Sequence, residues 1–174
     1  MANALYVLAG LLDADIDWMA GVGTLRRLDA GTRLIEAGFR PAELYFVLGG
    51  TLDVRLGDGK SVAMLGSGDL VGEMSFVEQR APGASVVAAT AAELLAVPAE
   101  RILAQLEEDQ GFGLRFYRAL AALLSERLRA TTAGTAPALD EAGVAQVEQA
   151  GAKFERLARL TREPEPPNLI ITQA

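Results

Sequence analysis

Short β-prone segments separated by glycine turns fill the middle of this sequence. Residues 44–48 are continuously apolar, which is typical of a buried strand. After Gly49-Gly50, apolar and polar residues alternate over 51–56, as they do in a strand with one buried face. An Asp-Gly pair at 58–59 favours a tight hairpin with a return strand over 61–65. Short strands at this spacing predict a small β-barrel or jelly roll.

The β-rich region continues to residue 97, and helices are expected before it. A further turn at 66–69 precedes two strands, 85–89 and 93–97, which we expect to pair with each other. On the N-terminal side, an apolar stretch at 4–12 and the acidic residues after it predict one or two short helices. These acids are expected at helix ends and in solvent: Asp13, Asp15 and Asp17.

Two helices are predicted directly after the strands. Pro98 suits the first turn of a helix, and the residues after it predict a short helix up to 107–108. A longer helix is predicted from about residue 112 to residue 130. One side of this helix is apolar: Phe112, Phe116, Leu120, Leu123 and Leu124. Its arginines are expected in solvent: Arg115, Arg118, Arg127 and Arg129.

Residues 132–174 are expected to be an appendage to a domain that spans 1–131. Composition predicts a linker at 131–137, a helix from about 139 to 160, and an extended, acidic, proline-rich tail. Residues of the helix recur at alternating spacings of three and four, which is typical of a helix that packs against a partner. They are Val144, Val147, Gly151, Phe154 and Ala158.

The composition narrows the chemistry that this chain can perform. Its 174 residues include no cysteine and no histidine, which excludes disulfides, thiolate zinc sites, cysteine nucleophiles and histidine general bases. A net charge of -7 opposes DNA binding, because affinity for DNA comes largely from neutralising phosphates. No apolar run is long enough to cross a membrane, and the start lacks the basic residues of a secretory signal. We therefore expect a cytoplasmic, non-enzymatic protein without membrane insertion.

Three motifs carry a resemblance to a known family. They are Leu28-x-x-Gly31-Thr32-x-Leu34-Ile35-x-x-Gly38, then Leu44-Tyr45-Phe46-Val47-Leu48-x-Gly50-x-Leu52-x-Val54, then Gly68-Asp69-x-x-Gly72-Glu73-Met74-Ser75-Phe76. In these motifs and in the order of its elements, the region from about 4 to 130 resembles the cyclic nucleotide-binding domain family, in particular catabolite activator protein-like effector domains. The resemblance implies a mainly β fold, a jelly-roll barrel with N-terminal and C-terminal helices.

In that family, the segment after the Gly-Glu pair is the phosphate-binding cassette, a short helix and loop that hold the nucleotide. The resemblance implies that Glu73 accepts a hydrogen bond from a ribose hydroxyl. It also implies that Gly72, Met74 and Ser75 open the short helix, whose backbone N–H groups receive the cyclic phosphate. A second interpretation of Glu73 needs no ligand, because an acid at a helix start is stabilised by the helix itself.

One position departs from the family pattern. The phosphate arginine of the family falls on Pro82, whereas the following Gly83, Ala84 and Ser85 still fit. Loss of a charged phosphate contact costs about 2 to 5 kcal/mol, so we expect weak binding of ordinary cyclic AMP. Arg80 lies two residues earlier and is either a replacement contact for the phosphate or a solvated loop residue.

The resemblance implies a regulatory protein. Regulators of transcription in this family continue into a winged helix-turn-helix, but the 43 residues after Thr131 carry 4 basic and 6 acidic residues, so we expect no DNA-reading module there. We expect a sensor with a cyclic nucleotide as its candidate ligand, which signals through its C-terminal helices to a protein partner or a second copy. The alternative is a ligand-independent interaction or oligomerisation scaffold with a degenerate pocket.

Overall fold

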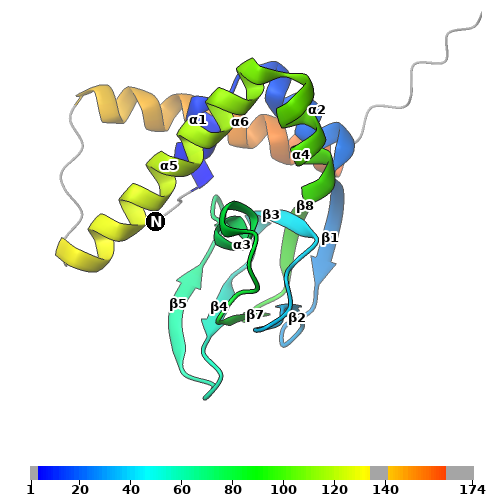
Figure 1. The fold of residues 1–174 in the computed structure, drawn as a ribbon, viewed down its shortest axis with the longest axis vertical. Coiled ribbons are helices and arrows are strands. Elements are labelled where there is room, and N and C mark those ends of the chain that lie inside the picture. The colour runs from blue at the N-terminus through cyan, green and yellow to red at the C-terminus, as the bar shows by residue number, and fades with distance from the viewer. Residues whose placement is uncertain (1–3, 134–140, 164–174) are drawn as a thin grey trace, which may run out of the picture.

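The computed structural model describes residues 4–133 and 141–163 and arranges them as two β-sheets with helices on one side (Figure 1). Helices α1 (Ala4–Gly10) and α2 (Asp13–Val22) precede the strands. Helices α4 (Ala99–Glu108), α5 (Gln110–Ala133) and α6 (Glu141–Arg162) follow the strands. The prediction of a mainly β region with N-terminal and C-terminal helices is therefore confirmed.

Within the described residues, the strands form two antiparallel four-stranded sheets. The first sheet has the order β1 (Thr24–Leu28), β8 (Ala92–Pro98), β3 (Glu43–Gly49) and β6 (Leu70–Val71). The second sheet has the order β2 (Arg33–Ile35), β7 (Ser85–Ala88), β4 (Leu52–Arg55) and β5 (Ser61–Leu65). Helix α3 (Glu73–Glu78) is inserted between β6 and β7 and lies at the side of the two sheets (Figure 1).

The first sheet is buried on both faces. Side chains alternate along a strand, so Phe46 of β3 and Leu95 of β8 pack into a core with the helices. Their neighbours Val47 and Leu94 pack into a second core between the two sheets. All four side chains are less than 1% exposed. The molecule therefore has three layers, with the first sheet between the helices and the second sheet.

The expected pairing of the strands at 85–89 and 93–97 is wrong. Strand β7 pairs with β2 and β4 in the second sheet, whereas β8 pairs with β1 and β3 in the first. The chain crosses from one sheet to the other at Thr90-Ala91. The reason lies in β8 itself, because both of its faces are apolar and have to be buried. Only a central strand of the first sheet, which lies between the helices and the second sheet, is covered on both faces.

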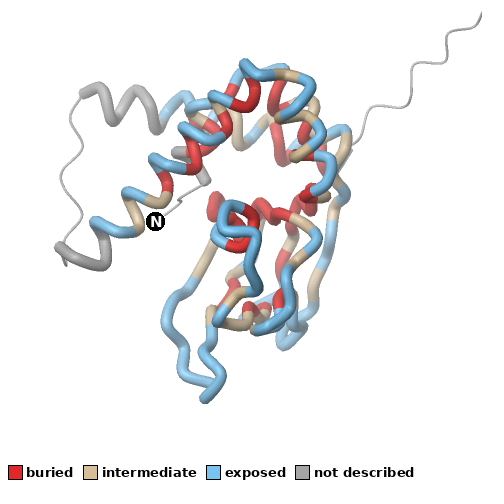
Figure 2. Tube along the Cα trace, viewed as in Figure 1, coloured by how far each residue is buried: buried red, intermediate tan, exposed pale blue. Residues whose placement is uncertain are grey.

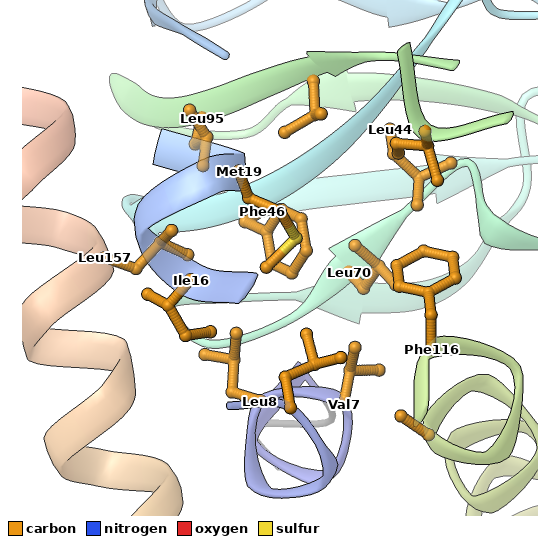
Figure 3. Close-up of a cluster of buried hydrophobic side chains, with 14 of the residues drawn as sticks. Val7, Leu8, Ile16, Met19, Leu44, Phe46, Leu70, Leu95, Phe116 and Leu157 are labelled. Atoms are coloured by element: carbon orange, nitrogen blue, oxygen red, sulfur yellow. The ribbon is translucent and has the colours of Figure 1, made fainter. Parts of the chain in front are cut away.

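The helices close over the outer face of the first sheet. Figure 3 shows Val7 and Leu8 of α1, Ile16 and Met19 of α2, Phe116 of α5 and Leu157 of α6 around Leu44, Phe46, Leu70 and Leu95. The buried stretches of these helices face the sheets in Figure 2. Helices α1 and α5 cross closely, since a Cβ atom placed on Gly10 would lie 3.2 Å from the Cβ atom of Ala119.

The partner of helix α6 lies within the same chain. Leu157 and Ala158 are buried in the helical core, and Phe154 packs against that core. Arg156 donates two hydrogen bonds to the carboxylate of Asp17 on α2, at 2.6 and 2.7 Å. The predicted packing of this helix is therefore confirmed for its second half, whereas the side chains of Val144 and Val147 lie outside the described residues.

An ion pair between the buried Asp15 and the half-buried Arg115 ties α2 to α5. Asp15 is 6% exposed and accepts hydrogen bonds from the Nε and Nη2 atoms of Arg115, both at 2.8 Å, and from the backbone N–H of Leu12. Burial opposes ionisation of Asp15, but the hydrogen bonds from Arg115 and Leu12 outweigh it and lower its pKa. Asp15 lies in the first turn of α2, as expected for an acid at a helix end. The expectation that Asp15 and Arg115 lie in solvent is wrong, because each neutralises the other where two helices meet.

Replacement of Asp15 by asparagine is expected to lower the free energy of unfolding by about 1 to 3 kcal/mol at pH 7. The lowered pKa means that ionised Asp15 stabilises the folded state above its unfolded pKa, and that this contribution disappears as the pH falls through the folded pKa. The difference between wild type and Asp15→Asn, measured by urea denaturation, should therefore shrink below about pH 4.

Asp13→Asn is the matched control for this experiment. The Asp13 side chain is 65% exposed and lies 4.0 Å from Arg156, so its loss is expected to change stability by less than about 0.5 kcal/mol. Equal effects of the two variants at pH 7 would contradict a structural role for the Asp15–Arg115 pair.

Candidate functional site

The site is built around the start of helix α3, where strand β6 ends. Gly72 precedes the helix with φ 92°, a left-handed conformation that glycine adopts without strain. A Cβ atom at this position would also lie 3.2 Å from the carbonyl oxygen of Glu43. The chain therefore turns sharply at Gly72 and places Glu73 in the first turn of α3, directly beside the buried strand.

Glu73 is buried and is paired with an arginine from the C-terminal helix α5. The residue is 3% exposed. Arg127 donates a hydrogen bond from Nη1 to Oε1 of Glu73, and a second one from Nη2 to the carbonyl oxygen of Leu70, at 2.8 Å. The expectation that Arg127 lies in solvent is wrong, because a buried carboxylate needs a compensating charge.

Burial and the neighbouring positive charge shift the pKa of Glu73 in opposite directions. Removal of the carboxylate from water raises its pKa, whereas the positive charge of Arg127 favours the ionised form. The nearby carboxylate of Asp69 adds to the increase. The net direction is a raised pKa, so Glu73 depends on Arg127, or on another donor in its place, to carry its charge in this position.

A cavity of about 400 Å³ lies between α3, the loop after it, and the second sheet. Its walls are mainly apolar: Ile35, Val54, Leu56, Leu65, Val71 and Val86. The cassette segment supplies Gly72, Glu73, Met74, Ser75, Glu78, Arg80, Ala81, Pro82, Gly83 and Ala84. Arg127 reaches the cavity from α5. The arrangement is an apolar recess with two arginines and a buried acid along its edge.

The structure brings eight of the nine predicted site residues to this cavity. They are Gly72, Glu73, Met74, Ser75, Arg80, Pro82, Gly83 and Ala84. Ser85 lies elsewhere: its Oγ atom accepts a hydrogen bond from the backbone N–H of Ala37, at 3.0 Å, and the residue lines a separate hollow. Eight residues predicted from their spacing therefore share one cavity. Ser85 instead connects the loop after β2 to β7.

The loop after α3 carries an arginine at position 80, whereas the family pattern has its arginine at position 82. Pro82 is half-buried, and its carbonyl oxygen accepts a hydrogen bond from the N–H of Gly38, at 2.8 Å. Arg80 is exposed, lines the cavity, and makes no ion pair with a carboxylate of the described residues. A cation is thus present at the cavity two residues before the position at which the pattern expects it.

Arg127 is the site residue that the sequence analysis did not identify. A signal for it exists in the spacing of α5, because Phe116, Leu120 and Leu123 are buried and Arg127 continues the same steps of four, three and four. An arginine on this face is directed toward the interior. Hydrophobic patterning alone assigns an arginine to solvent, so it predicts Arg127 on the solvent side of the helix, which is wrong.

Comparisons with known proteins agree with this geometry. Residues 25–109 match the family model described as the cyclic nucleotide-binding domain. The chain carries a cyclic nucleotide-binding domain. The catabolite activator protein of Thermus thermophilus has the same fold: it is 24% identical, with a TM-score of 0.61, over 91% of this chain and 87% of that chain. The predicted resemblance and jelly-roll fold are therefore confirmed.

Two further relatives are longer than the region that matches this chain. The Pycsar effector protein XpPycTIR of Xanthomonas perforans is 34% identical over 116 residues, which are 66% of this chain and 38% of that protein. Glutaminase 2 of Bradyrhizobium diazoefficiens is 34% identical over 126 residues, which are 71% of this chain and 20% of that protein. The cyclic nucleotide-binding domain thus corresponds to a minor part of each relative, within a family of regulatory domains.

Neither a metal-ion cluster nor a membrane-spanning helix is present among the described residues. No group of three or more acidic residues is placed so that it could hold a metal ion within 4–133 and 141–163. Over the same ranges, no helix is both long enough and apolar enough to cross a membrane.

Proposed function

We propose that this domain is a sensor that binds a cyclic nucleotide in the cavity beside α3. The observation that carries the proposal is the buried Glu73 at the edge of an apolar recess of about 400 Å³. A carboxylate with 3% exposure is costly to keep without a ligand or a paired charge, and a ribose hydroxyl is a donor of suitable chemistry. The match to the cyclic nucleotide-binding domain over 25–109 supports this use.

Arg80 is the proposed contact of the phosphate. It lines the cavity and is not committed to a carboxylate among the described residues. The cyclic phosphate carries one negative charge, and a guanidinium group binds a phosphate through two parallel hydrogen bonds. Pro82 adds no side-chain donor, so in this proposal Arg80 and the backbone of the cassette loop hold the phosphate together.

The apolar walls of the cavity are the proposed place of the base. Val54 and Leu56 of the β4 region and Leu65 of β5 contribute side chains without hydrogen-bonding groups. Such a surface accepts the face of a planar ring and does not distinguish the polar edges of different bases. We therefore propose that the cavity binds the cyclic phosphate ester of a nucleoside with little selection for the base from these walls.

A ligand-independent scaffold is the second candidate function. Arg127 already neutralises Glu73, and Pro82 stands at the position of the phosphate arginine. Both observations favour a domain whose pocket has lost its ligand and whose surfaces only hold other proteins. Calorimetry with cyclic AMP, cyclic GMP and cyclic dinucleotides separates the two candidates, because the scaffold binds none of them.

The domain is proposed to act by binding and not by catalysis. The chain has no histidine or cysteine to serve as a general base or nucleophile, and the charged groups at the cavity are carboxylates and arginines. Incubation of the purified protein with cyclic AMP or cyclic GMP should return the nucleotide unchanged. The cytoplasmic location expected from the sequence stays a prediction.

Replacement of Arg80 by alanine is expected to weaken binding of the preferred nucleotide by roughly 10- to 100-fold, because one charge-assisted contact with the phosphate is lost. Isothermal titration calorimetry measures the change. Arg118→Ala is the matched control, since Arg118 is an exposed arginine of α5 that does not line the cavity. An unchanged affinity in Arg80→Ala would exclude Arg80 as the phosphate contact.

Replacement of Pro82 by arginine is expected to tighten binding of cyclic AMP by roughly 30-fold or more, because it places a guanidinium group where the family pattern has one. The carbonyl of residue 82, which accepts from Gly38, remains in the variant. Pro82→Ala is the control for loss of the proline ring and should leave the affinity near that of wild type. Equal affinities of the arginine and alanine variants would show that the phosphate lies elsewhere.

A second copy of the chain is the proposed partner of α5. Apolar residues on the outer side of this helix recur at heptad spacing, Leu114, Tyr117, Ala121, Leu124 and Leu128. Leu114 is 73% exposed and Tyr117 is 48% exposed, although both are apolar or largely apolar. Helices pair along such a seam, so we propose that two domains associate through α5 and that the nucleotide acts on this assembly.

The protein is expected to have twice the mass of the 18.3 kDa chain in light scattering after gel filtration. The double variant Leu114→Glu/Leu128→Glu should be monomeric, because it places like charges opposite each other along the paired helices. Val62→Glu is the control, since Val62 is 50% exposed but lies on β5. A monomeric wild type at about 100 μM, or a dimeric double variant, would contradict association through α5.

A further inference from the structure

A polar contact ties the last part of α5 to the sheets. Apolar side chains anchor the helix as far as Leu123, which is 0% exposed. In the described stretch 124–129 that follows, no side chain is buried. Within this stretch, Arg127 reaches back to the sheets through its hydrogen bonds to Glu73 and Leu70. This guanidinium group therefore helps to fix the position of the end of α5.

Arg127 contacts one residue that lines the cavity and one that lies beside it. Glu73 opens α3 and lines the cavity, whereas Leu70 lies in β6, two residues before Gly72, and is buried in the helical core. Helix α3 also meets α5 at a second point, where the ring of Phe76 packs edge-on against the ring of Phe116 with centroids 5.9 Å apart. Both rings are buried. The aromatic contact is fixed in the core, whereas the ionic contact lies at the cavity.

A nucleotide in the proposed site competes with Arg127 for the same carboxylate. Glu73 is 3% exposed, so its oxygens have little room for donors other than those now present. Arg127 itself lines the cavity. A neutral hydroxyl group is a weaker donor than a guanidinium group, so displacement of Arg127 reduces the affinity of a ligand that takes its place. Removal of Arg127 should therefore tighten binding.

We propose that the Arg127–Glu73 pair is a latch, by which we mean a contact that holds the end of α5 against the cavity until a ligand hydroxyl takes Glu73. This inference rests on the proposed nucleotide site and adds a regulatory link to it. When the ligand binds, Arg127 leaves Glu73 and the helix beyond Leu123 loses this contact with the sheets. By reciprocity, any partner that draws the end of α5 away from the cavity raises the affinity for the ligand.

Arg127→Ala tests the latch by two measurements on the whole chain. In hydrogen exchange without nucleotide, the amides of 124–133 should exchange faster than in wild type, because their anchor is gone. In calorimetry with cyclic AMP and cyclic GMP, the variant should bind roughly tenfold more tightly, within the range typical of coupled sites. Arg127→Lys keeps the charge but cannot make the two hydrogen bonds of the guanidinium group. Its exchange rates and its affinity should lie between those of wild type and of Arg127→Ala.

Arg118→Ala is the matched control, and it should match wild type in both measurements. Thermal unfolding of each variant verifies that the domain is folded. Nucleotide binding that is unchanged or weaker in Arg127→Ala would overturn the latch and leave the proposed nucleotide site standing. If neither wild type nor any variant, including Pro82→Arg, binds a cyclic nucleotide, the proposed function is wrong, and the latch is then wrong as well.

Discussion

Strands β3 and β8 carry apolar side chains on both faces, so the sheet that they form needs cover from both sides. The second sheet supplies one cover and the helices supply the other. Strand β6 lies at the edge of this sheet, where Leu70 packs with the helices and Val71 packs with the second sheet. The cassette begins at the next residue, so the two cores together fix the place at which the chain turns into the cavity.

The chemistry of the site follows from burial of one carboxylate. Glu73 has a raised pKa because it is removed from water, and it stays in place through the positive charge of Arg127. This arrangement links ligand chemistry to a helix that is remote in sequence. The same pair supports both candidate functions, since it holds Glu73 ready for a ligand hydroxyl or serves as a permanent structural contact. The difference between them is a difference in energy and not in geometry.

Much of the fold could be predicted from the sequence, because apolar periodicity and glycine turns act locally. Nine cassette residues were predicted from their spacing, and eight of them line one cavity. The pairing of β8 and the places of Asp15 and Arg127 were not found, because they depend on what lies across the fold. A charged residue is predicted to lie in solvent unless its partner is known. In both ion pairs, the two residues are more than fifty positions apart in the sequence.

The close crossing of α1 and α5 sets limits on how the long helix can move. Gly10 leaves no space at Ala119, so α5 cannot slide past α1 at that point. A helix held there bends instead, and displacement grows with distance from the crossing. Arg127 lies about 12 Å further along the axis, so a bend of about 10° carries it roughly 2 Å, enough to break a hydrogen bond. Leu114 and Tyr117 lie on the other side of the crossing and keep their place. The first part of the proposed seam between two copies therefore persists, while Leu124 and Leu128 change position with Arg127.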